Sequence, residues 1–127
     1  MTTKRLKSHR ELEVYQQGFE AAMKIFEVTK HFPREETYSL TDQIRRSSRA
    51  VCSNIAEAWR RRRYEGAFVN CLNTSEAEAA ESQTWIEFAV KCGHLDRAAG
   101  RALYADYDNI LDKLVTMIRH PEQWTIG

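Results

Sequence analysis

Apolar residues recur at spacings of three and four along four stretches of the chain, and this period is typical of amphipathic helices. The stretches are residues 10–32, 39–62, 64–92 and 96–119, the last beginning at either Asp96 or Arg101. Pro33, Gly93 and Pro121 lie at their ends, where helices commonly stop. No stretch has the pattern of a strand. The sequence therefore predicts an all-α fold, an antiparallel up-down four-helix bundle.

The periodicity also predicts which side chains form the core. Small residues in the middle of the third stripe would let a neighbouring helix approach closely, and Ser39 is the expected N-cap of the second helix. The expected core stripes are Leu12, Tyr15, Phe19, Ala22 and Phe26; Leu40, Ile44, Val51 and Ile55; Phe68, Leu72, Ser75, Ala79, Ser82, Ile86 and Ala89; and Leu103, Tyr107, Ile110, Leu114 and Met117.

Several large apolar residues lie beside these stripes rather than on them. Either the core stripes are wide enough to include them, or they form a contact between subunits, where aromatic residues are common. We favour the second interpretation and expect a homo-oligomer. Trp124, in the tail, is expected to pack against the bundle. The residues beside the stripes are Trp59, Trp85, Phe88, Val90, Leu111 and Ile118.

Length and composition fit one globular domain over residues 1–127, with a basic N-terminal arm (1–10) and a C-terminal tail (120–127). No apolar run approaches the roughly 18–20 residues that span a bilayer, and the basic N-terminus lacks the apolar segment of a secretory signal. We expect a cytoplasmic protein without membrane contact.

Its three scattered cysteines, Cys52, Cys71 and Cys92, are expected to be buried small hydrophobic residues.

Charge is distributed unevenly, although the net charge is only +1. Residues 1–63 hold 14 Lys and Arg against 8 Asp and Glu, whereas residues 64–127 hold 5 against 10. On the second helix, arginines gather within an arc of about 100° opposite the core stripe. They could bind phosphates of a nucleic acid, or pair with carboxylates of the second half, within or between subunits. The arginines are Arg45, Arg46, Arg49, Arg60 and Arg63, extended by Arg61 and Arg62; the carboxylates are Glu76, Glu78, Glu81, Glu87, Asp106, Asp108 and Asp112.

The sequence lacks the patterns of common catalytic and metal sites. It has no Glu-x-x-His pair, no Gly-rich phosphate loop and no G-x-S-x-G. Its histidines stand near predicted helix ends, where capping or solvated positions are usual. We therefore expect no enzyme activity, no cofactor and no metal site. The histidines are His9, His31, His94 and His120.

One block of 26 residues, Phe32–Glu57, carries a distinctive series of short motifs. It contains Phe-Pro, Glu-Glu, Tyr-Ser-Leu-Thr, Gln-Ile-Arg-Arg and Asn-Ile-Ala-Glu in that order. This block resembles the signature of the four-helix bundle family encoded in intervening sequences of bacterial 23S rRNA genes. Leu12–Tyr15 resembles the family's opening motif, and Phe68 with Glu81 resembles its third helix, so the resemblance covers residues 11–119.

The resemblance implies a ring-like homopentamer. It also implies a relationship to accessory proteins of diversity-generating retroelements, which bind nucleic acid and partner a reverse transcriptase. Ala58, Ala77, Glu78 and Gln83 depart from the family pattern. The matching residues are Arg45, Arg46, Asn54, Glu57 and Arg61.

We expect a structural role for Glu57, in an ion pair within the arc, and for Asn54, bonded to a neighbouring helix. The function expected from the arginines and the resemblance together is binding of structured RNA or an RNA–DNA hybrid by an oligomer. The alternative is a protein-interaction scaffold whose charged faces serve self-assembly or partner binding.

Overall fold

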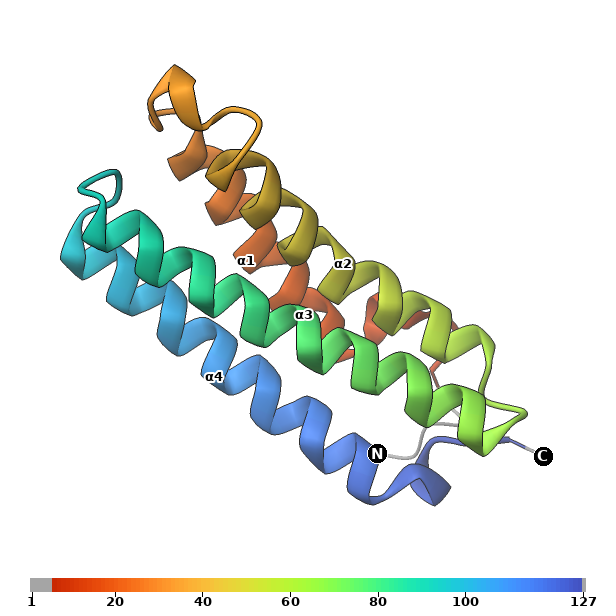
Figure 1. Cartoon of the computed structure of the whole chain (residues 1–127). Helices are drawn as coiled ribbons and strands as arrows, with labels where there is room; N and C mark the ends of the chain where they lie inside the picture. Colours follow the sequence, from red (N-terminus) through yellow and green to blue (C-terminus); the bar gives the residue numbers. More distant parts are fainter. Residues whose placement is uncertain (1–5, 127) are drawn as a thin grey trace.

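A computed structural model describes residues 6–126 of the protein, and within this range it contains helices and no strand. The long helices are α1 (Glu13–Thr29), α2 (Leu40–Arg60), α3 (Glu65–Lys91) and α4 (Arg97–Arg119) (Figure 1). Three short 3-10 helices, η2 (His9–Glu11), η3 (Arg34–Glu36) and η4 (Pro121–Gln123), flank or connect them. The predicted order and number of long helices are confirmed, each within a few residues at its ends.

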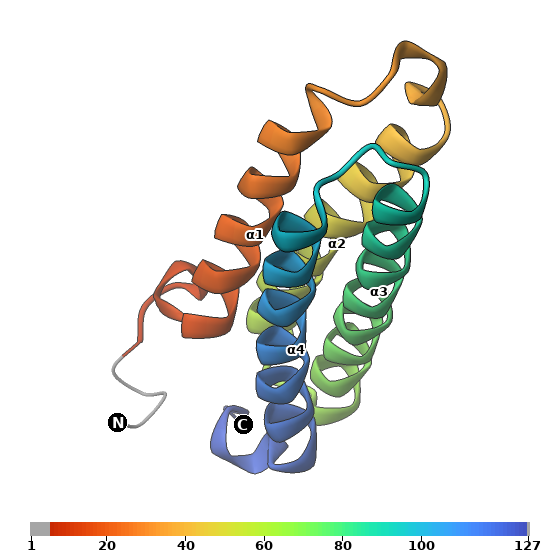
Figure 2. The same cartoon turned by 90° about the vertical axis from the view of Figure 1, so that its left-hand side faces the viewer.

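The helices form a four-membered bundle in which sequence neighbours lie side by side. Helix α2 contacts α1 and α3, α3 contacts α4, and α1 closes the arrangement against α4. Figure 2 shows α4 in front, with α1 on one side of it, α3 on the other and α2 behind. The α1–α2 and α3–α4 connections therefore lie at one end, and the α2–α3 turn lies at the other.

The predicted core stripes of the second, third and fourth helices are confirmed. Each of their expected residues is buried. The small residues of α3 do permit close approach of α2, and hydrogen bonds of their hydroxyl groups across the contact show it. Ser75 Oγ donates to the Val51 carbonyl at 2.8 Å, and Ser47 Oγ lies 2.8 Å from Ser82 Oγ.

The predicted stripe of the first helix is wrong. Only Leu12 of that set is buried, and the Phe19 side chain is 52% exposed. Apolar residues surround much of this helix, so periodicity alone does not select the inward face. The smaller residues face inward, allowing α1 to lie close to its neighbours, while the aromatic row turns toward the α1–α2 border. The buried positions of α1 are Val14, Gly18, Ala21, Ile25 and Thr29.

The N-cap prediction for the second helix needs a correction. Ser39 occupies the N-cap position of α2, as predicted, but its side chain makes no capping bond. Instead the Ser39 hydroxyl donates to Glu36 Oε1 at 2.6 Å, and that carboxylate accepts the Leu40 amide at 3.4 Å. Helix α4 is capped by Asp96, which accepts the Ala98 and Ala99 amides.

The apolar residues beside the stripes divide between core and surface. Trp59 is buried in the core, four of the others are half-buried against it, and Phe88 is exposed. Trp124 packs against the core as predicted. The four half-buried residues are Trp85, Val90, Leu111 and Ile118.

Cysteine burial matches the prediction at two of three positions. Cys52 and Cys71 are buried, and burial raises the pKa of the Cys52 thiol to about 11. Cys92 is exposed, so the prediction for that residue is wrong. Within residues 6–126, none of the helices has the length and hydropathy needed to cross a membrane.

Candidate nucleic-acid interface

Helix α2 carries its arginines on the side opposite its core stripe, as the helical periodicity predicts. Residues of the stripe, such as Ile44 and Ile55, are fully buried, whereas the guanidinium-bearing positions are half-buried or exposed. The arginine side chains differ, however, in how far their hydrogen-bonding groups are already engaged. Arg45, Arg61 and Arg62 have close partners within the chain, and the others are more open.

Arg45 is held against α1. Its Nε donates to Thr29 Oγ1 at 2.7 Å, and one terminal nitrogen lies 3.5 Å from the Phe26 carbonyl. Its guanidinium carbon also lies 4.9 Å from the centre of the Phe26 ring. Arg45 therefore fastens α2 to the end of α1, with part of its donor set used in that contact.

Two further members of the arginine arc pair along α2 itself. Arg61 lies 2.7 Å from Glu57, which confirms the ion pair expected for Glu57, and Arg46 lies 3.9 Å from Asp42. Both pairs are exposed to solvent, where such contacts contribute little to stability. Asn54 differs from the prediction, because its amide donates to the Ala50 carbonyl of its own helix at 2.8 Å.

The turn after α2 is cationic and anchored. Arg62 lies over the Trp59 ring, 3.5 Å from its centre, and donates from Nε to the Trp59 carbonyl at 2.7 Å. Partial burial and the charge of Arg60 lower the pKa of Arg62. The Ile126 amide donates to the Arg62 carbonyl, which ties the C-terminal tail to this turn.

Among the arginines of α2 and the turn after it, the most open are Arg46, Arg49, Arg60 and Arg63. All four are exposed, and within residues 6–126 the last three take part in no ion pair. We call these four residues the open arginines. They form two groups, Arg46 and Arg49 in the second and third turns of α2, and Arg60 and Arg63 at its last residue and in the turn that follows. The basic arm predicted for residues 1–10 lies partly outside the described residues.

Carboxylates of the third and fourth helices do not pair with the α2 arginines in the described part of one chain. Asp106 instead binds Lys24 at 3.2 Å, Asp108 accepts from Gln83 at 2.8 Å, and Glu81 accepts from the Trp85 indole at 3.2 Å. Within residues 6–126, direct ion pairs between these helices and the α2 arginines are therefore not observed, although the charge of Arg46 does act on Glu78 of α3. Pairing between subunits stays a prediction.

Glu78 lies near the cationic face, at a departure from the family pattern. Partial burial raises the pKa of Glu78, the charge of Glu81 raises it further, and Arg46 acts in the opposite sense. The charged form of Glu78 is thus disfavoured by folding.

We expect Glu78→Gln to raise the free energy of unfolding at neutral pH by about 0.5 kcal/mol or less. Because the folded pKa is raised, the penalty is present above that pKa, and it disappears as the pH falls below the ordinary value of 4.5. Urea unfolding at pH 7 and at pH 4 measures the difference. Glu76→Gln, at a half-buried site on the same helix, is the matched control, and an equal gain from both variants would contradict the prediction.

An apolar groove runs along the border of α1 and α2, and one of the open arginines, Arg49, lies on it. It encloses roughly 390 Å³. Its α1 wall is the aromatic row that periodicity had assigned to the core, together with Met23, which is 46% exposed. The groove was missed because the α1 stripe was placed inward. Its lining residues are Tyr15, Phe19, Ala22, Met23, Phe26, Arg49, Cys52, Ser53 and Ala56.

The fold and this face define a small all-helical bundle protein with a cationic outer helix. The chain belongs to the 23S rRNA-intervening sequence protein family, whose sequence model matches residues 10–116. The chain is also similar to a solved structure of a protein of unknown function from the S23 ribosomal protein family of Bacteroides thetaiotaomicron VPI-5482. The two share 26% identity with a TM-score of 0.76, over 84% of this chain and 98% of that one. No curated protein matches the sequence.

Proposed function

We propose that the protein binds structured RNA or an RNA–DNA hybrid, without catalysing a reaction, through the open arginines of α2. The observation that carries this proposal is their exposure along one face, with three of the four in no ion pair within residues 6–126. Guanidinium groups match phosphate geometry with parallel hydrogen bonds. Contact with backbone phosphates alone would make binding strongly salt-dependent and weakly sequence-dependent.

Arg45 and Arg61 have a smaller part in this proposal than the sequence indicated. Arg45 already binds α1, and Arg61 already binds Glu57. Phosphate binding by Arg61 would have to compete with that ion pair. Asn54 and Glu57 support the helix and its charges rather than the nucleic acid.

Combined substitution of Arg46, Arg49 and Arg60 by glutamine is expected to weaken RNA binding by about tenfold or more at about 50 mM salt. The slope of log affinity against log salt should also become shallower by about three, because roughly one unit is lost for each phosphate contact. Fluorescence anisotropy with a labelled hairpin RNA at about 50 and about 200 mM salt measures both quantities.

The matched control removes the same charge from another helix. Arg97, Arg101 and Arg119 are exposed on α4, and their combined substitution by glutamine changes net charge equally. This control should retain most of the affinity. Equal weakening of RNA binding by the two triple variants would mean that only the net charge matters, which would contradict the proposal. So would undetectable RNA binding by the native chain at low salt.

A second function, self-assembly as a scaffold, is favoured by the apolar groove of α1 and α2. Exposed Phe19 and Met23 provide the surface that a second copy would cover, and Arg49 lies on the same groove. Light scattering of the native protein at both salt concentrations separates the two functions. Dissociation of an oligomer at high salt would assign the arginines to subunit contacts. If high salt lowers the RNA affinity but leaves the oligomer intact, the arginines are not needed for subunit contacts and can bind phosphates.

A further inference from the structure

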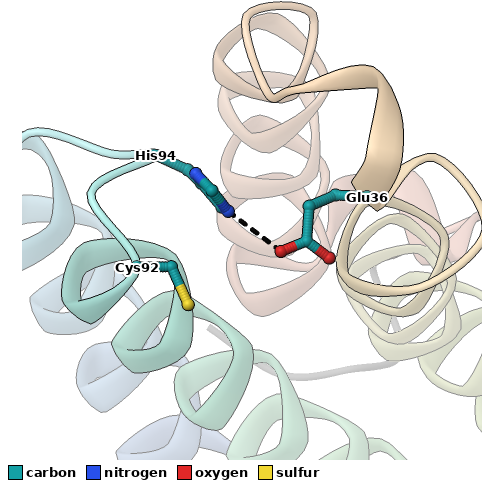
Figure 3. A group of neighbouring side chains, drawn as sticks. All are labelled: Glu36, Cys92 and His94. Carbon is teal, nitrogen blue, oxygen red and sulfur yellow. Dashed lines mark hydrogen bonds and ion pairs between the residues drawn. The ribbon is translucent and has the colours of Figure 1, made fainter.

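Two connections meet at the end of the bundle opposite the cationic turn. The α1–α2 connection contains η3 and ends at Ser39, and the α3–α4 connection runs from Cys92 to Asp96. Each contributes side chains to the space between them (Figure 3). This end of the molecule has no part in the proposed nucleic-acid function.

Three metal-binding residue types converge there. Glu36 comes from η3, and Cys92 and His94 come from the end of α3 and the residues that follow. The His94 Nε2 atom lies 2.9 Å from Glu36 Oε2. One nitrogen, one sulfur and one oxygen from the three residues all lie within 4.8 Å of one another. Figure 3 shows His94 and Glu36 directed toward each other from opposite sides, with the Cys92 side chain beside them on the His94 side.

Backbone hydrogen bonds fix the two α3 contributors. Gly93 has a φ of 78°, which favours glycine, and it ends the helix in a Schellman motif. The Gly93 amide donates to the Val90 carbonyl at 3.0 Å, and the His94 amide donates to the Ala89 carbonyl at 2.9 Å. This turn holds residues 92 and 94 on either side of a defined bend.

The carboxylate and the imidazole are also positioned. The second oxygen of Glu36 accepts the Ser39 hydroxyl at 2.6 Å, leaving Oε2 directed toward His94. These two contacts, with Ser39 on one oxygen and His94 on the other, hold the Glu36 carboxylate in place. The His94 ring lies 5.8 Å from the Phe32 ring. The Ser39 hydrogen bond to the carboxylate is the kind of outer contact that orients a metal ligand.

We propose that Glu36, Cys92 and His94 form a zinc site with three protein ligands. A thiolate with an imidazole and one carboxylate suits Zn²⁺, whereas Mg²⁺ and Ca²⁺ require more oxygen ligands. Donor atoms around tetrahedral zinc are about 3.3–3.7 Å apart, given bonds of about 2.0–2.3 Å. Since no two donor atoms are more than 4.8 Å apart, the Cys92 sulfur must approach the other two by at most about 1.5 Å, which its exposed side chain allows, while His94 Nε2 and Glu36 Oε2 must separate slightly from 2.9 Å.

The bound ion would join the two connections. Binding exchanges the thiol proton of Cys92 for zinc, and the proton that His94 Nε2 shares with Glu36 is released or carried instead by Nδ1. The direct His94–Glu36 contact is then replaced by two bonds to the metal. A fourth position stays open to water. The direct contact between His94 and Glu36 is enough to explain why these two side chains lie together. It does not explain why an exposed thiol, that of Cys92, lies within reach of both.

Cobalt is the probe, because a thiolate ligand gives Co²⁺ an intense charge-transfer band in the near ultraviolet. We expect untagged, reduced protein to bind one Co²⁺ per chain with this band, and Zn²⁺ to displace it. Cys92→Ser should abolish the band. Both Cys92→Ser and His94→Gln should lower zinc affinity by more than the roughly 10–100-fold lost when an outer-shell partner is removed.

The control is His120→Gln, which changes an exposed histidine 3.7 Å from Glu122. It should bind both metals as the native chain does. Circular dichroism of each variant checks the helices, and zinc should raise the melting temperature of the native and His120→Gln proteins alone. Cobalt binding without a charge-transfer band, a band that survives Cys92→Ser, or no saturable binding would each overturn the proposal.

Discussion

Replacing Ile55 by alanine is expected to lower the free energy of unfolding by about 2–5 kcal/mol. Ile55 is fully buried, and it stands in the C-terminal half of α2 within the Asn-Ile-Ala-Glu motif. Truncation removes three methyl or methylene carbons from a tightly packed region and leaves a cavity that helices on either side cannot close. Since domains of this size are stable by about 5–15 kcal/mol, the loss would be a large share of the total.

Urea unfolding monitored by circular dichroism measures the effect. Ile55→Val should cost about 0.5–1.5 kcal/mol, and Ser53→Ala, at an exposed position of the same helix, should stay within about 0.5 kcal/mol of the native value. Measurements at two protein concentrations separate folding from any coupled association. A loss below about 1 kcal/mol for the alanine variant would mean that Ile55 does not occupy a close-packed core.

Gly100→Ala is the second substitution with a large expected effect. Gly100 is buried in the first turns of α4, and a Cβ atom there would overlap the Cγ2 methyl of Val90 on α3. Alanine improves helix propensity by about 1 kcal/mol, but overpacking typically costs about 1–3 kcal/mol. Val90 is a short branched side chain with little freedom to move aside, so we expect a net loss of about 1–2 kcal/mol.

A double-mutant cycle tests the cause of that loss. Val90→Ala removes the methyl that Gly100→Ala would meet, so alanine at position 100 should become neutral or stabilising in that background. The coupling between the two positions is expected to reach about 1 kcal/mol or more. Additive effects would show that contact with Val90 is not what requires glycine.

Three of the four core faces were predictable from the sequence, and the exception has a physical reason. Helices α2, α3 and α4 alternate apolar stripes with charged positions, so the burial of Ile44, Leu72 and Tyr107 follows from spacing. Helix α1 has apolar side chains around most of its circumference. Which face of α1 turns inward depends on how the small Ala21 side chain fits against the neighbouring helices. The spacing of residues within α1 alone does not contain that information.

The cationic face was predictable as a group but not residue by residue. Spacing placed the arginines together, yet the hydrogen bond of Arg45 to Thr29 depends on how α1 and α2 cross. The local Asn54–Ala50 bond likewise competes with any contact to another helix. Side chains of this length can reach several acceptors, and packing decides among them.

The candidate zinc site could not be found from spacing alone. Glu36 and His94 are 58 positions apart, and they meet only because two connections share one end of the bundle. Cys92-Gly93-His94 was a local indication, since a Gly turn between two metal-binding residue types can bring them together. It was discounted because each residue was judged separately, as a buried thiol and as a histidine at a helix end.

The antiparallel arrangement separates two chemically different poles. Arg60 and the turn that follows it lie at one end of α2, and Glu36 lies at the other, with a 21-residue helix of roughly 30 Å between them. This separation exceeds the distance over which substitutions usually influence one another. Substitutions in the turn after Arg60 and at Glu36 should therefore have additive effects on stability, whereas Arg46, in the second turn of α2, stands nearer the Glu36 end.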